Sequence, residues 1–320
     1  MTDETTTPSA KDDYFIQVAK RYAAKDPRFQ ATLFSYYSVD PSFKDDLAKL
    51  FSGLSVGRKS WHPFGFVIAD MKNREVLHLD HRVIAVHPGL NLFADQRKFA
   101  LPDACYMVLF SPCVAREGFN DYFLAMRTRD VVLGLLASLA GRTICLDHIS
   151  DQVLVAATLE ETSVSNAFRV PHPYEFVAFN DPAILSETLD AILALPEEAR
   201  DSILFAQNVF GRAVQERDEW FRFSLYWISL EMIAQTKGDG VAAKIGNAYG
   251  QNKTYAYDDL EFRSVYERRH ALFHKGSFSS FDSRSERLIQ LYFFELLRLR
   301  LHLPCKRLAE AAISAFGRCT

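Results

Sequence analysis

The chain has 320 residues, enough for two domains, and its 40 acidic against 37 basic side chains give a formal net charge of −3. This balance excludes a global basic field that would attract nucleic acid regardless of sequence, although it permits a local basic cleft. Five scattered cysteines without a Cys-x-x-Cys pair, and the lack of an apolar run of membrane-spanning length, predict a cytoplasmic protein with reduced thiols and no membrane partner.

The N-terminal end is polar and rich in threonine, and it lacks the long apolar stretch of a secretory signal. We expect residues 1–12 to form a disordered tail. Apolar residues then recur at three- and four-residue steps, which predicts a helix over residues 13–25.

From Trp61 the pattern changes to short β-branched and aromatic runs, separated by turn signals such as Pro88-Gly89. The expected strands cover residues 62–69, 75–86, 104–110, 143–149, 152–159 and 168–179, and the expected helices cover 130–140 and 182–195. These elements predict an α+β domain over residues 13–195, which ends near Leu195-Pro196. Its role is not readable from its residues, so sensing, regulation and RNA selection all stay open.

Two segments of this domain contain residue types that occur in binding sites, but neither matches the pattern of a known site. His78, Asp80, His81 and His87 could be metal ligands, but side chains alternate along a strand, so His78 and His81 would point to opposite faces. Their spacing fits no metal-ligand pattern, and the chain contains no P-loop or GxGxxG motif. We therefore expect neither a metal nor a cofactor. The acidic and aromatic segment 121–129 is interpreted as the rim of a strand.

Residues 196–320 are expected to form a second, all-helical domain. Helical periodicity covers residues 197–215 and 218–237, and the second of these segments is apolar on two stripes, as in the core of a bundle. Gly238 is expected to end that helix, and a short helix follows over 242–249.

A long apolar helix is expected to close the domain. Ser283 and Glu286 have the spacing of a capping box at its start, and Pro304 ends or kinks it. In the earlier helix, Glu231 is a carboxylate among apolar residues and needs a partner. Glu231 is either a supporting partner of Arg269 or His274, in the segment described next, or it is a partly exposed residue or a member of a purely architectural ion pair.

The segment Tyr266-Glu-Arg-Arg-His-Ala-Leu-Phe-His274-Lys-Gly276 carries the most chemistry. Other copies of an arginine followed by a histidine at this spacing lie in strand-like or glycine-broken stretches. Only Arg269 and His274 lie in a helical pattern, and Gly276 is expected to stop the helix. A solvated helix end is the alternative interpretation of this pattern.

Arg269 could grip a phosphate with its planar fork of donors, and His274 could act as general acid or general base. At about 100° per residue the two lie roughly 140° apart around a helix. One helix therefore cannot easily aim both at the same phosphate, which mildly favours a site shared between two copies. His270 lies on the same helix face as His274, and the candidate catalytic residues are Arg269, His270 and His274. The candidate substrate-binding residues are Arg268, Lys275 and Tyr266.

The Arg-x4-His motif, the Trp227-Ile-Ser-Leu-Glu231 segment before it and the long helix after it occur in an order that resembles the Apea-like branch of the HEPN superfamily. The resemblance covers a little over a third of the chain. Lys275 departs from it, because many relatives place a small residue directly after the histidine. The resemblance implies a helical bundle and a homodimer in which two motifs meet across a two-fold axis. It also implies that His270 holds the position of a supporting polar residue.

The activity implied by this resemblance is metal-independent cleavage of RNA, such as tRNA or single-stranded RNA, in a bacterial defence or toxin setting, with a regulatory partner or trigger as a further possibility. The RNA 2′-hydroxyl would attack its neighbouring phosphate to leave a 2′,3′-cyclic phosphate and a 5′-hydroxyl, which excludes DNA. Two alternatives stay open. The domain could be a non-catalytic module for nucleotide or RNA binding or for dimerisation, or the α+β domain could be the enzyme.

Overall fold

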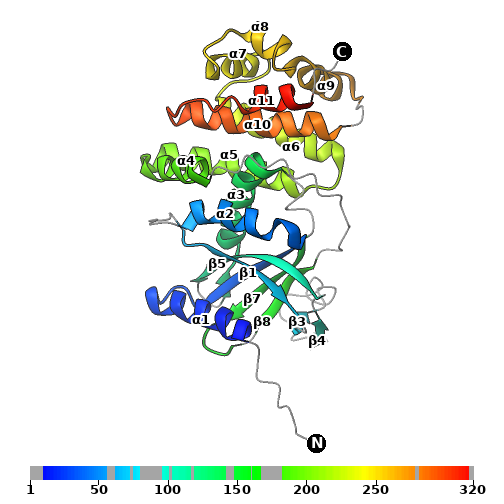
Figure 1. Cartoon of the computed structure of the whole chain (residues 1–320). Coiled ribbons are helices and arrows are strands. Elements are labelled where there is room, and N and C mark those ends of the chain that lie inside the picture. Colours follow the sequence, from blue (N-terminus) through cyan, green and yellow to red (C-terminus); the bar gives the residue numbers. More distant parts are fainter. Residues whose placement is uncertain are drawn as a thin grey trace, which may run out of the picture. The chain divides into compact units, whose positions relative to one another are not determined.

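The computed structural model describes residues 10–55, 62–72, 75–79, 96–100, 103–116, 119–141, 148–159, 161–166, 182–277 and 281–316. The chain divides into two compact units, which are described separately. Unit 1 comprises residues 1–44, 60–129 and 147–171, and unit 2 comprises residues 45–59, 130–146 and 172–320. Figure 1 shows a strand-rich unit and a helical unit, which confirms the α+β class.

Unit 1 is built on a sheet whose described strands follow the order β2-β5-β1-β7-β8-β3-β4, with β6 paired to β5. The strands are β1 (Ala31–Val39), β2 (Gly65–Met71), β3 (Glu75–Leu79), β4 (Gln96–Ala100), β5 (Ala104–Arg116), β6 (Phe119–Asp121), β7 (His148–Val155) and β8 (Glu161–Asn166). Neighbouring strands are antiparallel except for the parallel pair β3 and β8. Every residue of β1 is buried, so this strand is the centre of the sheet.

Helices cover both faces of this sheet. The helix α1 (Ala10–Lys25) packs Phe15 and Val18 against Phe34 and Tyr36 of β1 on one face. On the other face, Ala125 from the first part of α3 (Phe123–Ala140) belongs to a second apolar cluster with β1, β5 and β7. A short helix η1 (Pro41–Phe43) follows β1.

The sequence expectations for unit 1 need three corrections. Residues 10–12 are helical, because α1 begins at Ala10 inside the expected tail. The strand β1 was not expected, because buried polar residues interrupt its apolar pattern. The segment 121–129 is mainly helical rather than a strand rim, since α3 begins at Phe123, whose N–H donates to Asp121 Oδ1.

Other expectations for unit 1 are confirmed or lie outside the described residues. The expected strands at 62–69 and 104–110 match β2 and β5. Two strands were expected at 143–149 and 152–159, but residues 148–155 form the single strand β7 and residues 156–158 form a turn. The expected strand at 75–86 is described only through Leu79 as β3. Asp80, His81 and His87 and the expected strand at 168–179 lie outside the described residues.

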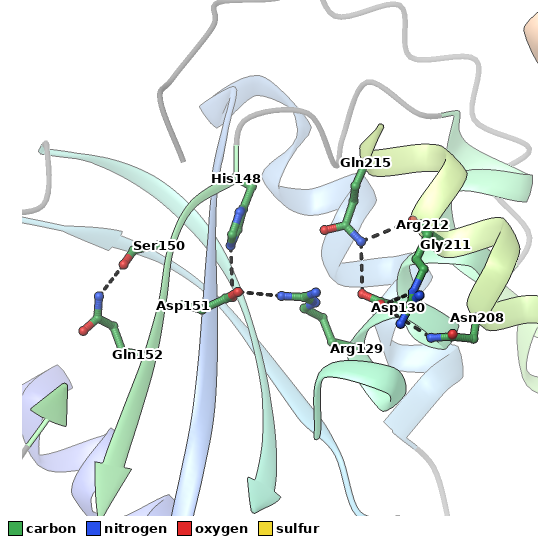
Figure 2. A network of polar contacts seen from close by, with 10 residues as sticks. All are labelled: Arg129, Asp130, His148, Ser150, Asp151, Gln152, Asn208, Gly211, Arg212 and Gln215. Carbon is green, nitrogen blue, oxygen red and sulfur yellow. Dashed lines mark hydrogen bonds and ion pairs between the residues drawn. The ribbon is translucent and has the colours of Figure 1, made fainter. Parts of the chain in front are cut away.

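A buried ion cluster joins α3 to β7 within unit 1 (Figure 2). Arg129 Nη1 lies 2.6 Å from Asp151 Oδ2, and His148 Nε2 lies 3.0 Å from Asp151 Oδ1. The Asp151 side chain is only 1% exposed. Burial raises the pKa of this carboxyl, but the charges of Arg129 and His148 outweigh burial and hold the pKa below its usual range.

We expect Arg129→Met to destabilise the protein by about 3–5 kcal/mol, because it leaves the Asp151 carboxylate buried without its main cation. The double variant with Asp151→Asn should recover part of this loss. The measurement is urea-induced unfolding of the full chain, followed by near-ultraviolet circular dichroism. Because the pKa of Asp151 is lowered in the fold, the stabilisation is present above the carboxyl's ordinary pKa and is lost as the pH falls. A loss below about 1 kcal/mol in Arg129→Met at neutral pH would contradict this account.

Unit 2 is helical in its described residues. It contains the C-terminal part of α3 and the helices α2 (Lys44–Ser55, from Asp45 onward), α4 (Pro182–Ala194), α5 (Glu197–Gln215), α6 (Glu219–Ala234), α7 (Asp239–Ala248), α8 (Lys253–Asp258), α9 (Phe262–Lys275), α10 (Ser283–Arg300) and α11 (Leu308–Phe316). Every residue of α10 from Ser285 to Arg298 is buried, and α6, α7, α9 and α11 all contact this helix. The core of unit 2 is therefore arranged around α10.

The charged residues of α10 are buried with partners. Arg287 donates to the carbonyls of Ala137 and Ser138 at the C-terminal end of α3, at 3.1 and 3.2 Å. Burial lowers the pKa of Arg287 to about 10. Glu295 accepts the N–H of Leu308 at 2.8 Å and so caps the start of α11. These contacts hold segments that are distant in sequence against one helix.

The helix expected over 197–215 is confirmed as α5, but two expected helix ends are wrong. The helix α6 ends at Ala234 through Gln235 in the left-handed region, so Gly238 instead precedes α7. At α10 the capping residue is Asp282, which accepts the Ser285 N–H at 2.7 Å, and not Ser283.

Two further features of unit 2 differ from the pattern expected for its sequence. The proposed capping partner Glu286 is buried and accepts the Tyr226 hydroxyl at 3.1 Å. The helix α4 and residues 130–146 group with the C-terminal helices, whereas the sequence placed a boundary at Leu195-Pro196.

Candidate active site on α9

The helix α9 carries the Arg-x4-His motif, and its start is held by α10. Glu261 precedes α9 in the left-handed region and accepts two hydrogen bonds from Arg284 of α10, at 2.7 and 3.1 Å. Along α9, Phe262, Val265 and Leu272 are buried. Gly276, at a φ of 61°, ends the helix as the sequence predicts.

Arg269 and His274 meet within one chain. Arg269 Nη1 lies 2.9 Å from His274 Nε2. The two side chains therefore meet on one helix, although their positions are roughly 140° apart around its axis. Five residues advance a helix by only about 7.5 Å, and the long arginine side chain reaches along the axis as well as around it. A guanidinium only donates, so Nε2 of His274 is the acceptor and the ring proton lies on Nδ1 in this contact.

Arg269 is held between aromatic rings and a carboxylate. Its guanidinium lies 5.5 Å from the Trp227 ring centre and 5.6 Å from that of Phe273, which are cation–π distances. Arg269 Nη2 lies 4.0 Å from Oε1 of Glu231, and the same oxygen accepts the Gly238 N–H at 2.9 Å. Glu231 thus faces the motif arginine at the limit of an ion pair, its closer partner is the Gly238 N–H, and its side chain is partly exposed, at 21%.

Arg269 also has an unused donor. Its Nε is buried and has no hydrogen-bond partner among the described residues. A buried donor of this kind costs roughly 1–3 kcal/mol, so an acceptor that reaches it is favoured. The side chain is oriented but retains capacity for an anion.

A cavity of about 510 Å³ lies beside the pair, between α8 and α9. Its lining residues combine two tyrosine rings, two cations, one carboxylate and one imidazole: Tyr257, Arg263, Tyr266, Glu267, His270 and Lys275. The His270 ring lies 4.8 Å from the His274 ring, so His270 adjoins both the cavity and the arginine–histidine pair.

The six residues expected from the sequence are thus divided. Arg269, His270 and His274 lie together, and Tyr266 and Lys275 line the adjoining cavity. Arg268 does neither. Its Nη2 donates to Asp282 Oδ2 at 3.3 Å, and its guanidinium lies 5.8 Å from the Phe281 ring centre. This arginine fastens α9 to the start of α10.

Several residues of this site were not predicted from the sequence. Trp227 was quoted for the family resemblance but not as a partner of Arg269. Tyr257 lies on the six-residue helix α8, which is too short to show a period. Arg263 and Glu267 lie in the first and second turns of α9, and their helical spacing from His270 is the signal that could have identified them.

Comparison with protein-family models, with curated proteins and with solved structures finds no match to this chain. Within the described residues, every helix is too short or too polar to span a lipid bilayer. In that same part of the chain, no group of three or more histidine, cysteine, aspartate or glutamate side chains is arranged to hold a metal ion.

We expect His274 to carry its ring proton on Nδ1, because Nε2 accepts from Arg269. Long-range ¹H–¹⁵N correlation spectra at about pH 8, where imidazoles are ordinarily neutral, report the tautomer directly. The Arg269→Gln variant should lose this restraint and change the His274 pattern, while exposed His302 stays unchanged as an internal control. A proton on Nε2 of His274 in the unmodified protein would show that the contact does not form in solution.

Proposed function

We propose that this protein is a metal-independent endoribonuclease whose active site is formed by Arg269, His270 and His274. The observation that carries the proposal is the direct contact of Arg269 with His274 at 2.9 Å, with a second imidazole next to it. A phosphate-binding cation and two proton-transfer groups are the parts that RNA cleavage by its own 2′-hydroxyl requires.

In this mechanism a phosphate takes the place of His274 as the acceptor for the Arg269 guanidinium. The Nε2 lone pair of His274 is then released and takes the proton of the 2′-hydroxyl. The 2′ oxygen bonds to phosphorus as the bond from phosphorus to the 5′ oxygen breaks, and His270 gives a proton to that leaving oxygen. The products are a 2′,3′-cyclic phosphate and a 5′-hydroxyl. Arg269 neutralises the charge that gathers on the phosphoryl oxygens.

A homodimer is part of the proposal, and exposed apolar residues of unit 2 support it. Phe221 and Ile228 on α6 are 55% and 42% exposed, and Phe273 on α9 is 46% exposed. Ile228 lies one turn before Glu231 on α6, so this apolar stripe runs toward the carboxylate that faces Arg269. A second copy of the chain bound here would cover the apolar surface next to the Arg-x4-His motif of each copy. The cytoplasmic bacterial defence or toxin setting rests on the resemblance to HEPN domains alone.

The test of catalysis is cleavage of bulk tRNA and of a labelled single-stranded RNA in EDTA, with analysis of the product ends. We expect Arg269→Ala to lower the rate at least about 100-fold, because it removes the phosphate clamp. Arg269→Lys should recover only part of the activity, since lysine lacks the bidentate fork. His274→Ala should cost roughly 10²–10⁴-fold.

The exposed Arg127→Ala serves as the matched control and should cleave like the unmodified protein. Cyclic-phosphate ends that disappear in the Arg269 and His274 variants would support the proposal. Cleavage that survives both substitutions would place the activity elsewhere in the chain.

A non-catalytic nucleotide- or RNA-binding module is the second candidate. It is favoured by a specific observation, namely that the cavity lining includes neither Arg269 nor His274. Under this interpretation no RNA is cut in the assay above, whereas RNA binding is retained, also in Arg269→Ala, because Arg269 does not line the cavity.

The dimer has its own test. The double variant Phe221→Ser and Ile228→Ser should shift the protein from dimer to monomer, because it removes apolar area from the stripe that the second copy would cover. Size-exclusion chromatography with light scattering measures the mass. Phe123→Ser, at a residue 64% exposed on α3, is the matched control and should leave the mass unchanged. An unmodified protein that is already a monomer at micromolar concentration would refute this part of the proposal.

A further inference from the structure

We infer that the cavity between α8 and α9 is a nucleoside subsite that takes a guanine base of the RNA next to the cleaved bond. This inference rests on the proposed ribonuclease function and adds a substrate preference to it. The volume of about 510 Å³ lies inside the roughly 300–1,000 Å³ typical of small-molecule sites.

The aromatic part of the cavity suits a base. The Tyr257 and Tyr266 rings lie 5.8 Å apart at 71°, so they form a corner that offers a face and an edge rather than a closed stack. Single-stranded RNA is commonly read by bases that stack on aromatic rings or on arginine planes.

The corner is held in place before any ligand arrives. The Tyr257 hydroxyl donates to Asp239, which also accepts from Lys253 Nζ at 2.8 Å. These two hydrogen bonds, with the hydrogen bond to Lys253 the larger cause, lower the pKa of Asp239. The Arg263 guanidinium lies 5.3 Å from the Tyr257 ring centre and is paired with Asp258 at 2.7 Å. A preorganised ring loses little further freedom when a base binds.

The charges of the cavity select the ligand. Arg263 and Lys275 lie about 18 Å apart along α9, at opposite ends of the cavity lining, so both ends of the cavity are cationic and attract the phosphates of an RNA strand. Glu267 is the acidic residue among the described lining residues, and an ionised carboxylate only accepts hydrogen bonds. Guanine presents two adjacent donors, N1–H and the N2 amino group, to such a fork. Adenine, cytosine and uracil each place an acceptor beside the donor on that edge, so Glu267 favours guanine.

The position of the cavity links the base to the reaction. His270 lines the cavity and its ring lies 4.8 Å from that of His274. A nucleoside in this cavity therefore lies against His270, the residue next to the arginine–histidine pair. Cleavage is expected next to guanosines in unpaired RNA.

The test is isothermal titration of the unmodified full chain with the 5′-monophosphates of guanosine, adenosine, cytidine and uridine. We expect guanosine monophosphate to bind at least about tenfold more tightly than adenosine monophosphate, the discrimination typical of a good bidentate contact. Glu267→Gln should reduce this ratio to below about threefold, since the amide nitrogen no longer accepts. Glu267 is exposed, so the substitution leaves the fold intact.

A matched pair tests the stacking surface. Tyr257→Leu should weaken the binding of guanosine monophosphate about fivefold or more, whereas Tyr257→Phe should keep most of the affinity because it keeps the ring. Equal affinity for all four nucleotides, or an unchanged ratio in Glu267→Gln, would overturn the guanine assignment. No binding of any nucleotide would overturn the subsite itself.

The outcome is separable from that of the nuclease proposal. Arg269 does not line the cavity, so Arg269→Ala should retain the preference for guanosine monophosphate while RNA cleavage is lost. Nucleotide binding with no cleavage in the unmodified protein would keep the subsite and refute the nuclease. Cleavage with no base preference at the cut sites would support the nuclease and refute the guanine subsite.

Discussion

The burial of α10 is the constraint on which unit 2 depends. An unbroken run from Ser285 to Arg298 is buried, although it contains two glutamates, two arginines and a glutamine. Charged groups tolerate such a position only when each is paired, because an unpaired buried charge costs several kcal/mol or more. The partners come from distant segments: Glu187 on α4 holds Arg298 at 2.8 Å, and the end of α3 accepts from Arg287. The polar pairing of one helix therefore specifies which segments surround it.

The candidate active site follows from this arrangement. The start of α10 fixes α9 through the pairs Arg284–Glu261 and Arg268–Asp282, so the motif helix has a defined position and rotation. The helix α6 packs against the same α10 and brings Trp227 and Glu231 to the other side of Arg269. Because α6 and α9 share the buried support of α10, the contacts of both helices determine where the partly exposed guanidinium of Arg269 lies.

The helices of unit 2 could largely be predicted from the sequence, because a helix shows itself in the spacing of apolar residues and in the residues that end it. The period of α9 and the stop at Gly276 are local, and both were found. The strand β1 was missed because residues such as Thr32 and Ser35 read as exposed yet are fully buried. The contact of Arg269 with His274 depends on how a long side chain lies along the helix, and residue angles alone do not show it. The cavity lies between α8 and α9, and the periodicity of one helix in the sequence does not show which other helix lies beside it.

The state of Arg269 explains why one site supports both a catalytic and a binding interpretation. Its contacts with Trp227, Glu231 and His274 orient the guanidinium, yet its buried Nε has no hydrogen-bond partner among the described residues. Glu231 at 4.0 Å only partly offsets the positive charge of Arg269. In the proposed mechanism a phosphate would take the place of His274 beside the guanidinium, so that anion binding and release of the histidine lone pair would be one event. What distinguishes an enzyme from a binder here is whether the released imidazole then meets a ribose 2′-hydroxyl, and the neighbouring cavity that would seat the nucleoside determines that geometry.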